Sequence, residues 1–157
     1  MFKAAGVLLI FMGGSLIAGR MNKIAERDLR LIDGWISFMR YVKGQIECFG
    51  VPIDKILSAC DTALFTEIGY KKANVPGNLT ELISECTLPD KETACLIFDY
   101  AKEFGRYYRE EQLKRCNYYI VALEEKRKRE SDKLPQRKRL NTTLWIAGSL
   151  AVGILLL

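Results

Sequence analysis

The chain has 157 residues, 24 of them basic and 19 acidic, a formal net charge of +5, and no histidine. Without histidine, a cysteine nucleophile lacks its usual general base and a zinc site would need four thiolates. The five cysteines are odd in number and include no C-x-x-C spacing, so free buried thiols in a reducing compartment are expected.

The chain begins with an uncharged run over residues 4–19, between Lys3 and Arg20. As a helix, this run reaches roughly 24 Å, against a hydrocarbon core of about 30 Å. A secretory signal peptide has a similar layout, but its cleavage site would be Ile17-Ala18-Gly19, with a bulky residue where a small one is expected. We therefore predict a membrane-spanning helix over residues 1–19. A cleaved signal peptide and a buried core helix are the alternatives, and the glycines of the run disfavour a core helix.

A helical stripe follows Arg20. Apolar residues recur there at steps of four and three, with one polar interruption at Asp28, and this periodicity places them on one face of a long helix. The positions of the stripe are Met21, Ala25, Asp28, Ile32, Trp35, Met39, Val42, Ile46 and Phe49. We expect this face to line the core of the soluble domain; a partner-binding seam is the alternative.

Turn signals divide the middle of the chain into shorter helices. Pro52 suits the first turn of a helix, and Asn78 with Glu81 three residues later predicts a capping box. Asp90 is likewise a residue type that favours the start of a helix. The predicted helices cover about residues 52–60, 63–72, 79 onward, and 90–104.

A sixth helix is predicted from Arg106 to about Lys133, after a bend at Gly105. Beyond Leu123 the sequence is almost wholly charged, so this end should project as a polar helix that Pro135 breaks or kinks. No alternation of period two has a useful length, so we predict no sheet. The apolar positions of this helix are Tyr108, Leu113, Cys116, Tyr119, Ile120 and Leu123.

Residues 140–157 carry no charge, and Trp145 is placed to anchor them at a membrane interface. We predict a second membrane span here, after a basic juxtamembrane linker over residues 135–139. Both apolar runs contain small residues four apart, which let another helix approach closely; simple lipid anchoring is the alternative. The expected helix-packing residues are Gly14, Ala18, Ala147, Gly148, Ala151 and Gly153.

Positive charge gathers beside both apolar runs. Residues 20–43 hold six basic residues against three acidic ones, and residues 126–139 hold eight against two. Because positive charge marks the cytoplasmic side of a membrane, residues 20–134 are expected to form a cytoplasmic helical domain. The basic residues expected beside the lipid headgroups are Arg20, Lys23, Arg137, Lys138 and Arg139.

The folded middle of the chain has the opposite charge balance. Residues 44–125 hold nine basic and fourteen acidic residues, whereas a nucleic-acid binder needs a basic face. The sequence also contains no phosphate-binding glycine motif, no nucleophile elbow and no paired-histidine motif. We therefore expect no nucleic-acid partner, no metal, no cofactor and no enzymatic activity.

Several motifs follow one another in a definite order. They are the glycine-bearing amino-terminal run, residues 45–53, Phe104-Gly105 ahead of Gln112 and Leu123, a long charged helix, and Lys138-Arg139-Leu140 leading into residues 148–157. In this order and spacing the chain resembles the stage III sporulation protein AB family of endospore-forming bacteria over nearly its whole length. It departs from the family at Gln45, Cys48 and Val51, where the family tends to carry a carboxylate, an aromatic residue and a hydroxyl.

The resemblance implies an all-α, non-enzymatic platform subunit of the channel complex that links mother cell and forespore during engulfment. The soluble domain of that family is similar to the cytoplasmic helical domains of the platform protein in type II secretion and type IV pilus machines. The implied partners are a sporulation-specific secretion-type ATPase, other subunits of the same complex and the lipid bilayer. The implied location is the mother-cell membrane around the forespore.

We expect the partner surface at the start of the last helix, because charges of both signs alternate there. The residues concerned are Arg106, Arg109, Glu110, Gln112, Lys114 and Arg115. An unrelated membrane-tethered helical adaptor would share every physical feature above. A membrane-bound enzyme is a second alternative, and it would show a deep polar pocket with convergent ionisable groups.

Overall fold

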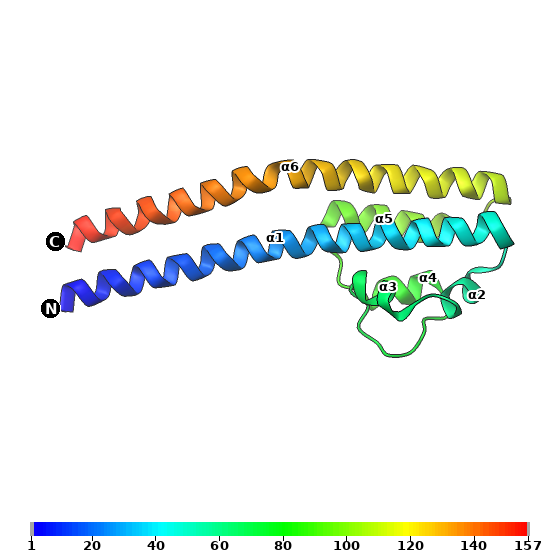
Figure 1. Ribbon diagram of the computed structural model, residues 1–157, viewed down its shortest axis with the longest axis horizontal. Coiled ribbons are helices and arrows are strands. Elements are labelled where there is room, and N and C mark those ends of the chain that lie inside the picture. Colours follow the sequence, from blue (N-terminus) through cyan, green and yellow to red (C-terminus); the bar gives the residue numbers. More distant parts are fainter. Residues whose placement is uncertain (1, 157) are drawn as a thin grey trace. The chain divides into compact units, whose positions relative to one another are not determined.

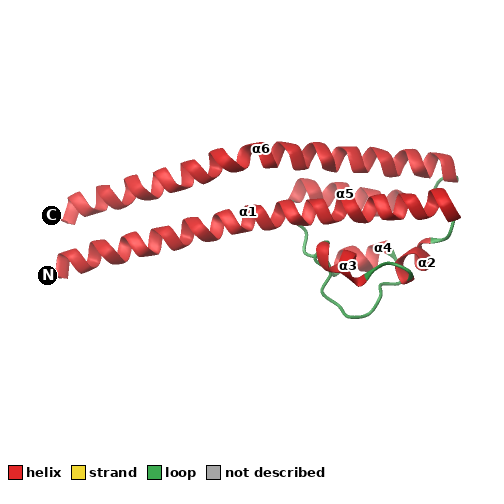
Figure 2. Cartoon of the chain, viewed as in Figure 1, coloured by secondary structure: helices red, strands yellow, loops and turns green. Residues whose placement is uncertain are grey.

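The computed structural model describes the backbone of residues 2–156 and the side chains of residues 19–148 and 151. Six helices form within this part, and no strand does (Figures 1 and 2). The prediction of an all-α chain with about six helices is confirmed. The helices are α1 (Phe2–Phe49), α2 (Ile53–Ser58), α3 (Thr62–Glu67), α4 (Leu79–Ser84), α5 (Lys91–Glu103) and α6 (Arg109–Leu156).

The chain divides into two compact units. The core unit is Asp28–Lys128, and the terminal unit combines Met1–Arg27 with Arg129–Leu157. The long helices α1 and α6 contribute to both units. The core unit is therefore somewhat shorter at each end than the domain predicted over residues 20–134.

The α1 stripe lines the hydrophobic centre of the core unit. Its central positions are buried, as predicted, whereas its end positions Met21 and Phe49 are exposed. The buried stripe residues are Ile32, Trp35, Met39, Val42 and Ile46. Across from them, α6 contributes Cys116, Tyr119, Ile120 and Leu123, all four of which were predicted as apolar positions. Periodicity thus identified the packed faces of both long helices.

Gly34 sets how closely α3 approaches α1. A Cβ atom at this position would lie 2.5 Å from the carbonyl oxygen of Glu67, the last residue of α3. Real Cβ atoms do not come this close to a backbone oxygen, so the packing of these two helices requires glycine.

Side-chain caps start three of the four shorter helices, α3, α4 and α5. The Asn78 Oδ1 accepts a hydrogen bond from the Glu81 amide at 2.8 Å, as the capping-box prediction required. The returning bond goes from the Gly77 amide to the Glu81 carboxylate, one residue before the cap. Asp90 caps α5 by accepting from the amides of Glu92 and Thr93.

Lys126 on α6 is a buried cation that holds the start of α5. Its side chain is 8% exposed, and its Nζ lies 3.4 Å from Asp90 Oδ1 and 2.6 Å from Glu92 Oε2. Burial alone would raise the pKa of Asp90, but hydrogen bonds from Thr93 and the charge of Lys126 outweigh it and lower that pKa. The pairing of Lys126 with Asp90 therefore adds stability only while Asp90 is ionised.

The Lys126→Met variant is expected to lose about 1 kcal/mol of stability at neutral pH. A hydrogen bond to a charged group usually contributes roughly 1.5–3 kcal/mol. The expected loss is smaller because the Asp90 and Glu92 side chains are 39% and 57% exposed, so water screens their charges. Since the folded-state pKa of Asp90 is lowered, its contribution is present above the unfolded-state value and is lost as pH falls through the folded-state value. The difference from wild type, measured by urea unfolding, should shrink on acidification. Lys128→Met, at an exposed site on the same helix, should show no such pH dependence.

Pro135 was predicted to break or kink the last helix. It lies inside α6, so the helix does not break there. The turns that follow the proline are held to α1 within the terminal unit. Lys138 Nζ lies 2.6 Å from Glu26 Oε1, and Asn141 Nδ2 lies 3.4 Å from Asn22 Oδ1. These contacts favour a continued helix, and residues 135–139, predicted as a basic linker, are helical.

Within the part of the chain that is described, no helix is long and apolar enough to cross a membrane. Of the spans expected over residues 1–19 and 140–157, residues 1–18, 149, 150 and 152–157 lie outside the residues whose side chains are described. Among the expected helix-packing residues, Ala147, Gly148 and Ala151 are exposed. Gly14, Ala18 and Gly153 lie outside the residues whose side chains are described.

All five cysteines are free, but the expectation that they are buried is wrong for two of them. Cys48 and Cys95 are exposed, because they lie at positions of α1 and α5 that face away from the centre. Burial raises the pKa of the Cys60 thiol to about 11 and that of Cys86 to about 12, and it also raises the pKa of Cys116.

We expect two thiols of the native chain to react rapidly with Ellman's reagent at pH 8, and all five after denaturation. The buried thiols stay protonated at that pH and are shielded from the reagent, whereas the exposed ones are accessible. The Cys48→Ser and Cys95→Ser variants should each remove one rapid equivalent. Rapid reaction of any of the three remaining thiols in the double variant would contradict this burial.

Candidate functional site

The end of α1 and the start of α6 meet through Arg109. The Arg109 guanidinium donates from Nε to the carbonyl oxygen of Ile46 at 3.2 Å, and a second nitrogen donates to the carbonyl oxygen of Glu47. These carbonyls belong to the last turn of α1, which Gly50 closes in a left-handed conformation (φ 61°). Arg109 was predicted to bind a partner, but its side chain is used in this cap.

Gln112 was predicted on the same partner surface, and it is buried instead. Its Oε1 accepts a hydrogen bond from the Gly105 amide at 2.9 Å, and its Nε2 lies 3.9 Å from the Cys116 sulfur. The bond to Gly105 holds the turn between α5 and α6, where the glycine has a φ of 76°. Gln112 therefore positions the surface without being part of it.

Arg115 is also occupied within the chain. Its guanidinium lies 3.2 Å from the Glu111 carboxylate, 3.3 Å from the Glu103 carboxylate and 4.8 Å from the centre of the Tyr107 ring. The other three predicted partner residues, Arg106, Glu110 and Lys114, are exposed. The structure thus divides the six predicted residues into three that face solvent and three that hold the local fold.

The two most exposed aromatic residues at this end of the core unit are Tyr108 and Phe49. Tyr108 is 94% exposed and Phe49 is 70% exposed. We call Phe49, Arg106, Tyr108 and Glu110 the tip. Both aromatic residues were predicted at apolar positions, because each fits the periodicity of its helix. Their positions beside the turns at Gly50 and Gly105 were the signal that they lie beyond the core.

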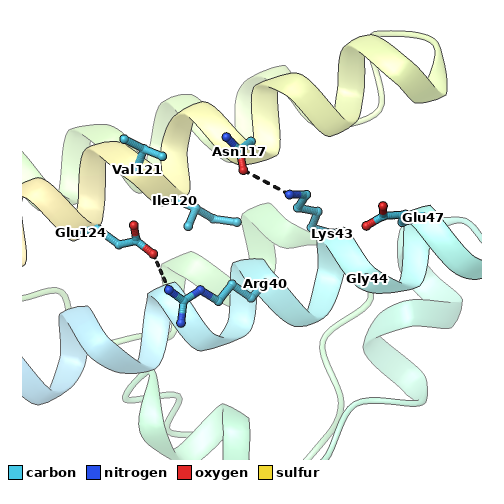
Figure 3. Close-up of a pocket in the computed structure, with 8 residues that line it drawn as sticks. All are labelled: Arg40, Lys43, Gly44, Glu47, Asn117, Ile120, Val121 and Glu124. Atoms are coloured by element: carbon cyan, nitrogen blue, oxygen red, sulfur yellow. Dashed lines mark hydrogen bonds and ion pairs between the residues drawn. The ribbon is translucent and has the colours of Figure 1, made fainter.

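A groove runs between α1 and α6 on the core unit (Figure 3). One hollow of about 350 Å³ is crossed by two polar contacts: Arg40 pairs with Glu124, and Lys43 Nζ donates to Asn117 Oδ1 at 3.1 Å. A second hollow of about 470 Å³ shares Lys43, Glu47 and Asn117 with the first, so the two are continuous. We call this feature the α1–α6 groove. Its lining is Arg40, Lys43, Gly44, Glu47, Leu113, Lys114, Asn117, Tyr118, Ile120, Val121 and Glu124.

Some basic residues of the terminal unit form ion pairs within the chain. Arg137 lies 3.0 Å from the Glu130 carboxylate, and Lys138 is paired with Glu26. Arg20, Lys23 and Arg139 are exposed.

Among the described residues, no group of three or more potential ligands is placed to hold a metal ion. No curated protein and no solved structure matches the chain. The family model of stage III sporulation protein AB matches residues 3–157, which is nearly the whole chain. With this match, the chain belongs to the stage III sporulation protein AB family.

Proposed function

We propose that this stage III sporulation protein is a non-enzymatic platform subunit, anchored in the mother-cell membrane around the forespore, that docks a cytoplasmic secretion-type ATPase. Family membership and the resemblance to secretion platform proteins support the role. The observation that carries the docking proposal is the tip, where Tyr108 and Phe49 are exposed on a rigid end of the core unit.

The tip has the composition of a protein-binding surface. Large aromatic residues supply most of the binding energy at such surfaces, and a polar rim surrounds them. Here Arg106 and Glu110 form the polar rim. The Arg109 cap and the bond from Gly105 to Gln112 fix the backbone on both sides, so little ordering is needed on binding.

The membrane anchor is proposed from the sequence pattern of the two ends. The exposed Arg20, Lys23 and Arg139 lie beside the two apolar runs, where each can gain about 1 kcal/mol from anionic headgroups. Flotation of the full-length chain with vesicles of phosphatidylglycerol and phosphatidylethanolamine tests this part. The chain should float with the vesicles and stay bound at high salt, because the apolar runs are insensitive to screening. A chain that remains at the bottom of the gradient would contradict the anchor.

The Tyr108→Ala variant is expected to weaken binding of the full-length chain to the sporulation ATPase by more than tenfold. Removing a central aromatic anchor from an interface typically costs about 2 kcal/mol or more. The measurement is a pull-down titration in a mild non-ionic detergent. Phe98→Ala serves as the control, because Phe98 is a half-exposed aromatic residue on α5, outside the tip. Equal binding by both variants and wild type, or no binding by wild type, would contradict the docking proposal.

A further inference from the structure

The packing within one chain gives no reason for a glycine at position 44. It lies in the interior of α1, and a Cβ atom built there would meet nothing within 4 Å. Glycine in a helix interior lowers stability by about 0.5–1 kcal/mol relative to alanine, so its presence calls for a reason. Gly44 lies on the wall of the α1–α6 groove, where a residue without a side chain lets another backbone approach closely.

The charges around the groove alternate in sign. At the end near the tip, α1 carries Glu47 and α6 carries Lys114. At the other end, α1 carries Arg40 and α6 carries Glu124. Negative and positive groups thus occupy opposite corners. A uniformly acidic or uniformly basic partner would meet like charge at two of these four corners.

We propose that the α1–α6 groove is the contact surface for a second copy of this chain, packed face to face about a two-fold axis parallel to the helices. Such an axis places α1 of one copy over α6 of the other. Glu47 then faces Lys114 of the second copy, and Arg40 faces Glu124 of the second copy. Each contact occurs twice, as an isologous interface requires.

The middle of the groove suits such an interface. Tyr118 and Val121 are 62% and 42% exposed, and Leu113 adds apolar surface beside them. An apolar centre with a charged rim is the usual anatomy of protein interfaces. The pair between Arg40 and Glu124 crosses the groove, but both side chains are well exposed, and exposed pairs contribute only about 0–1 kcal/mol. Exchanging these partners for those of a second copy therefore costs little.

Charge reversal with rescue tests the proposal on the full-length chain in a mild non-ionic detergent, with the mass of the protein measured by sedimentation velocity. Wild type should form dimers. Lys114→Glu should raise the dissociation constant by about tenfold or more, because it faces Glu47 of the second copy with like charge. Combining Glu47→Lys with Lys114→Glu in one chain should restore the dissociation constant to within about threefold of wild type.

Gly44→Leu should weaken the dimer by about tenfold or more while leaving the helix content unchanged, because space is open at this site within one chain. Two matched controls lie outside the groove: Thr80→Leu on α4 and Lys91→Glu on α5, both exposed, should leave the dimer intact. Circular dichroism at 222 nm confirms that each variant is folded.

Three results would overturn the proposal. They are a monomeric wild type up to about 100 μM, a dimer that neither Gly44→Leu nor Lys114→Glu weakens, and a double charge reversal that fails to restore association. The outcome is independent of ATPase docking, because Tyr108→Ala removes the tip and should leave the dimer unchanged.

Discussion

The Trp35→Ala variant is expected to lose about 3–5 kcal/mol of unfolding free energy, the usual range for removing a large buried aromatic side chain. Trp35 is fully buried at the centre of the core unit, and its ring meets that of Phe38 edge to face at 5.6 Å. Domains of this kind are stable by only about 5–15 kcal/mol, so the loss is a large share of the total. Guanidinium unfolding of the full-length chain, followed by circular dichroism at 222 nm, measures it.

Two further variants show whether the cause is the lost packing. Trp35→Phe should cost less than Trp35→Ala, because it keeps an aromatic ring and removes an indole N–H that is buried without a hydrogen-bond partner in the described part of the chain. Val75→Ala, at a half-exposed loop position, should change stability by less than about 1 kcal/mol. A Trp35→Ala variant as stable as wild type would mean that α1 does not pack as described.

One substitution at two glycines of α1 should give opposite results. Gly34→Ala is expected to destabilise the chain by about 1–3 kcal/mol or more, because its Cβ would lie 2.5 Å from the Glu67 carbonyl oxygen. Gly44→Ala is expected to stabilise it by about 0.5–1 kcal/mol, because the added methyl group enters open space and alanine favours the helix.

The same unfolding measurement serves both variants, and each is the control for the other. The helix, the residue type and the added methyl group are identical, so only the surroundings differ. Destabilisation of similar size at both positions would show that the approach of α3 to α1 is not the cause. For Gly44, stability should be compared at a protein concentration low enough to keep the chain monomeric.

Local signals predicted most of the fold. Each of these signals involves residues within one or two helical turns of one another. The structure contains the buried face of α1, the Asn78 cap of α4 and the Asp90 cap of α5. The error at Pro135 has a different origin. Proline disfavours a helix locally, but contacts of Lys138 and Asn141 with residues of α1 more than a hundred positions away hold the helix together.

The candidate site was predicted less well, because its chemistry depends on contacts between distant segments. Charged residues at the start of α6 were predicted to bind a partner, yet the Arg109 side chain caps α1, 62 residues earlier in the chain. Gln112 is polar, but its side chain is buried because its Oε1 accepts a hydrogen bond from the Gly105 amide in the turn before α6. Conversely, Tyr108 fits the apolar periodicity predicted for the last helix, but it lies outside the core and is exposed.

The contacts that close the core unit also set an order of events during synthesis. Lys43 meets Asn117 across 74 positions, and Asp33 meets Arg127 across 94, so α1 has no α6 to pack on until most of the chain has been made. At about 5–20 residues per second, the apolar side of α1 emerges from the ribosome roughly 4–19 s before its partner. Nascent chains stalled ahead of Arg109 should therefore be the form of this protein most dependent on chaperones.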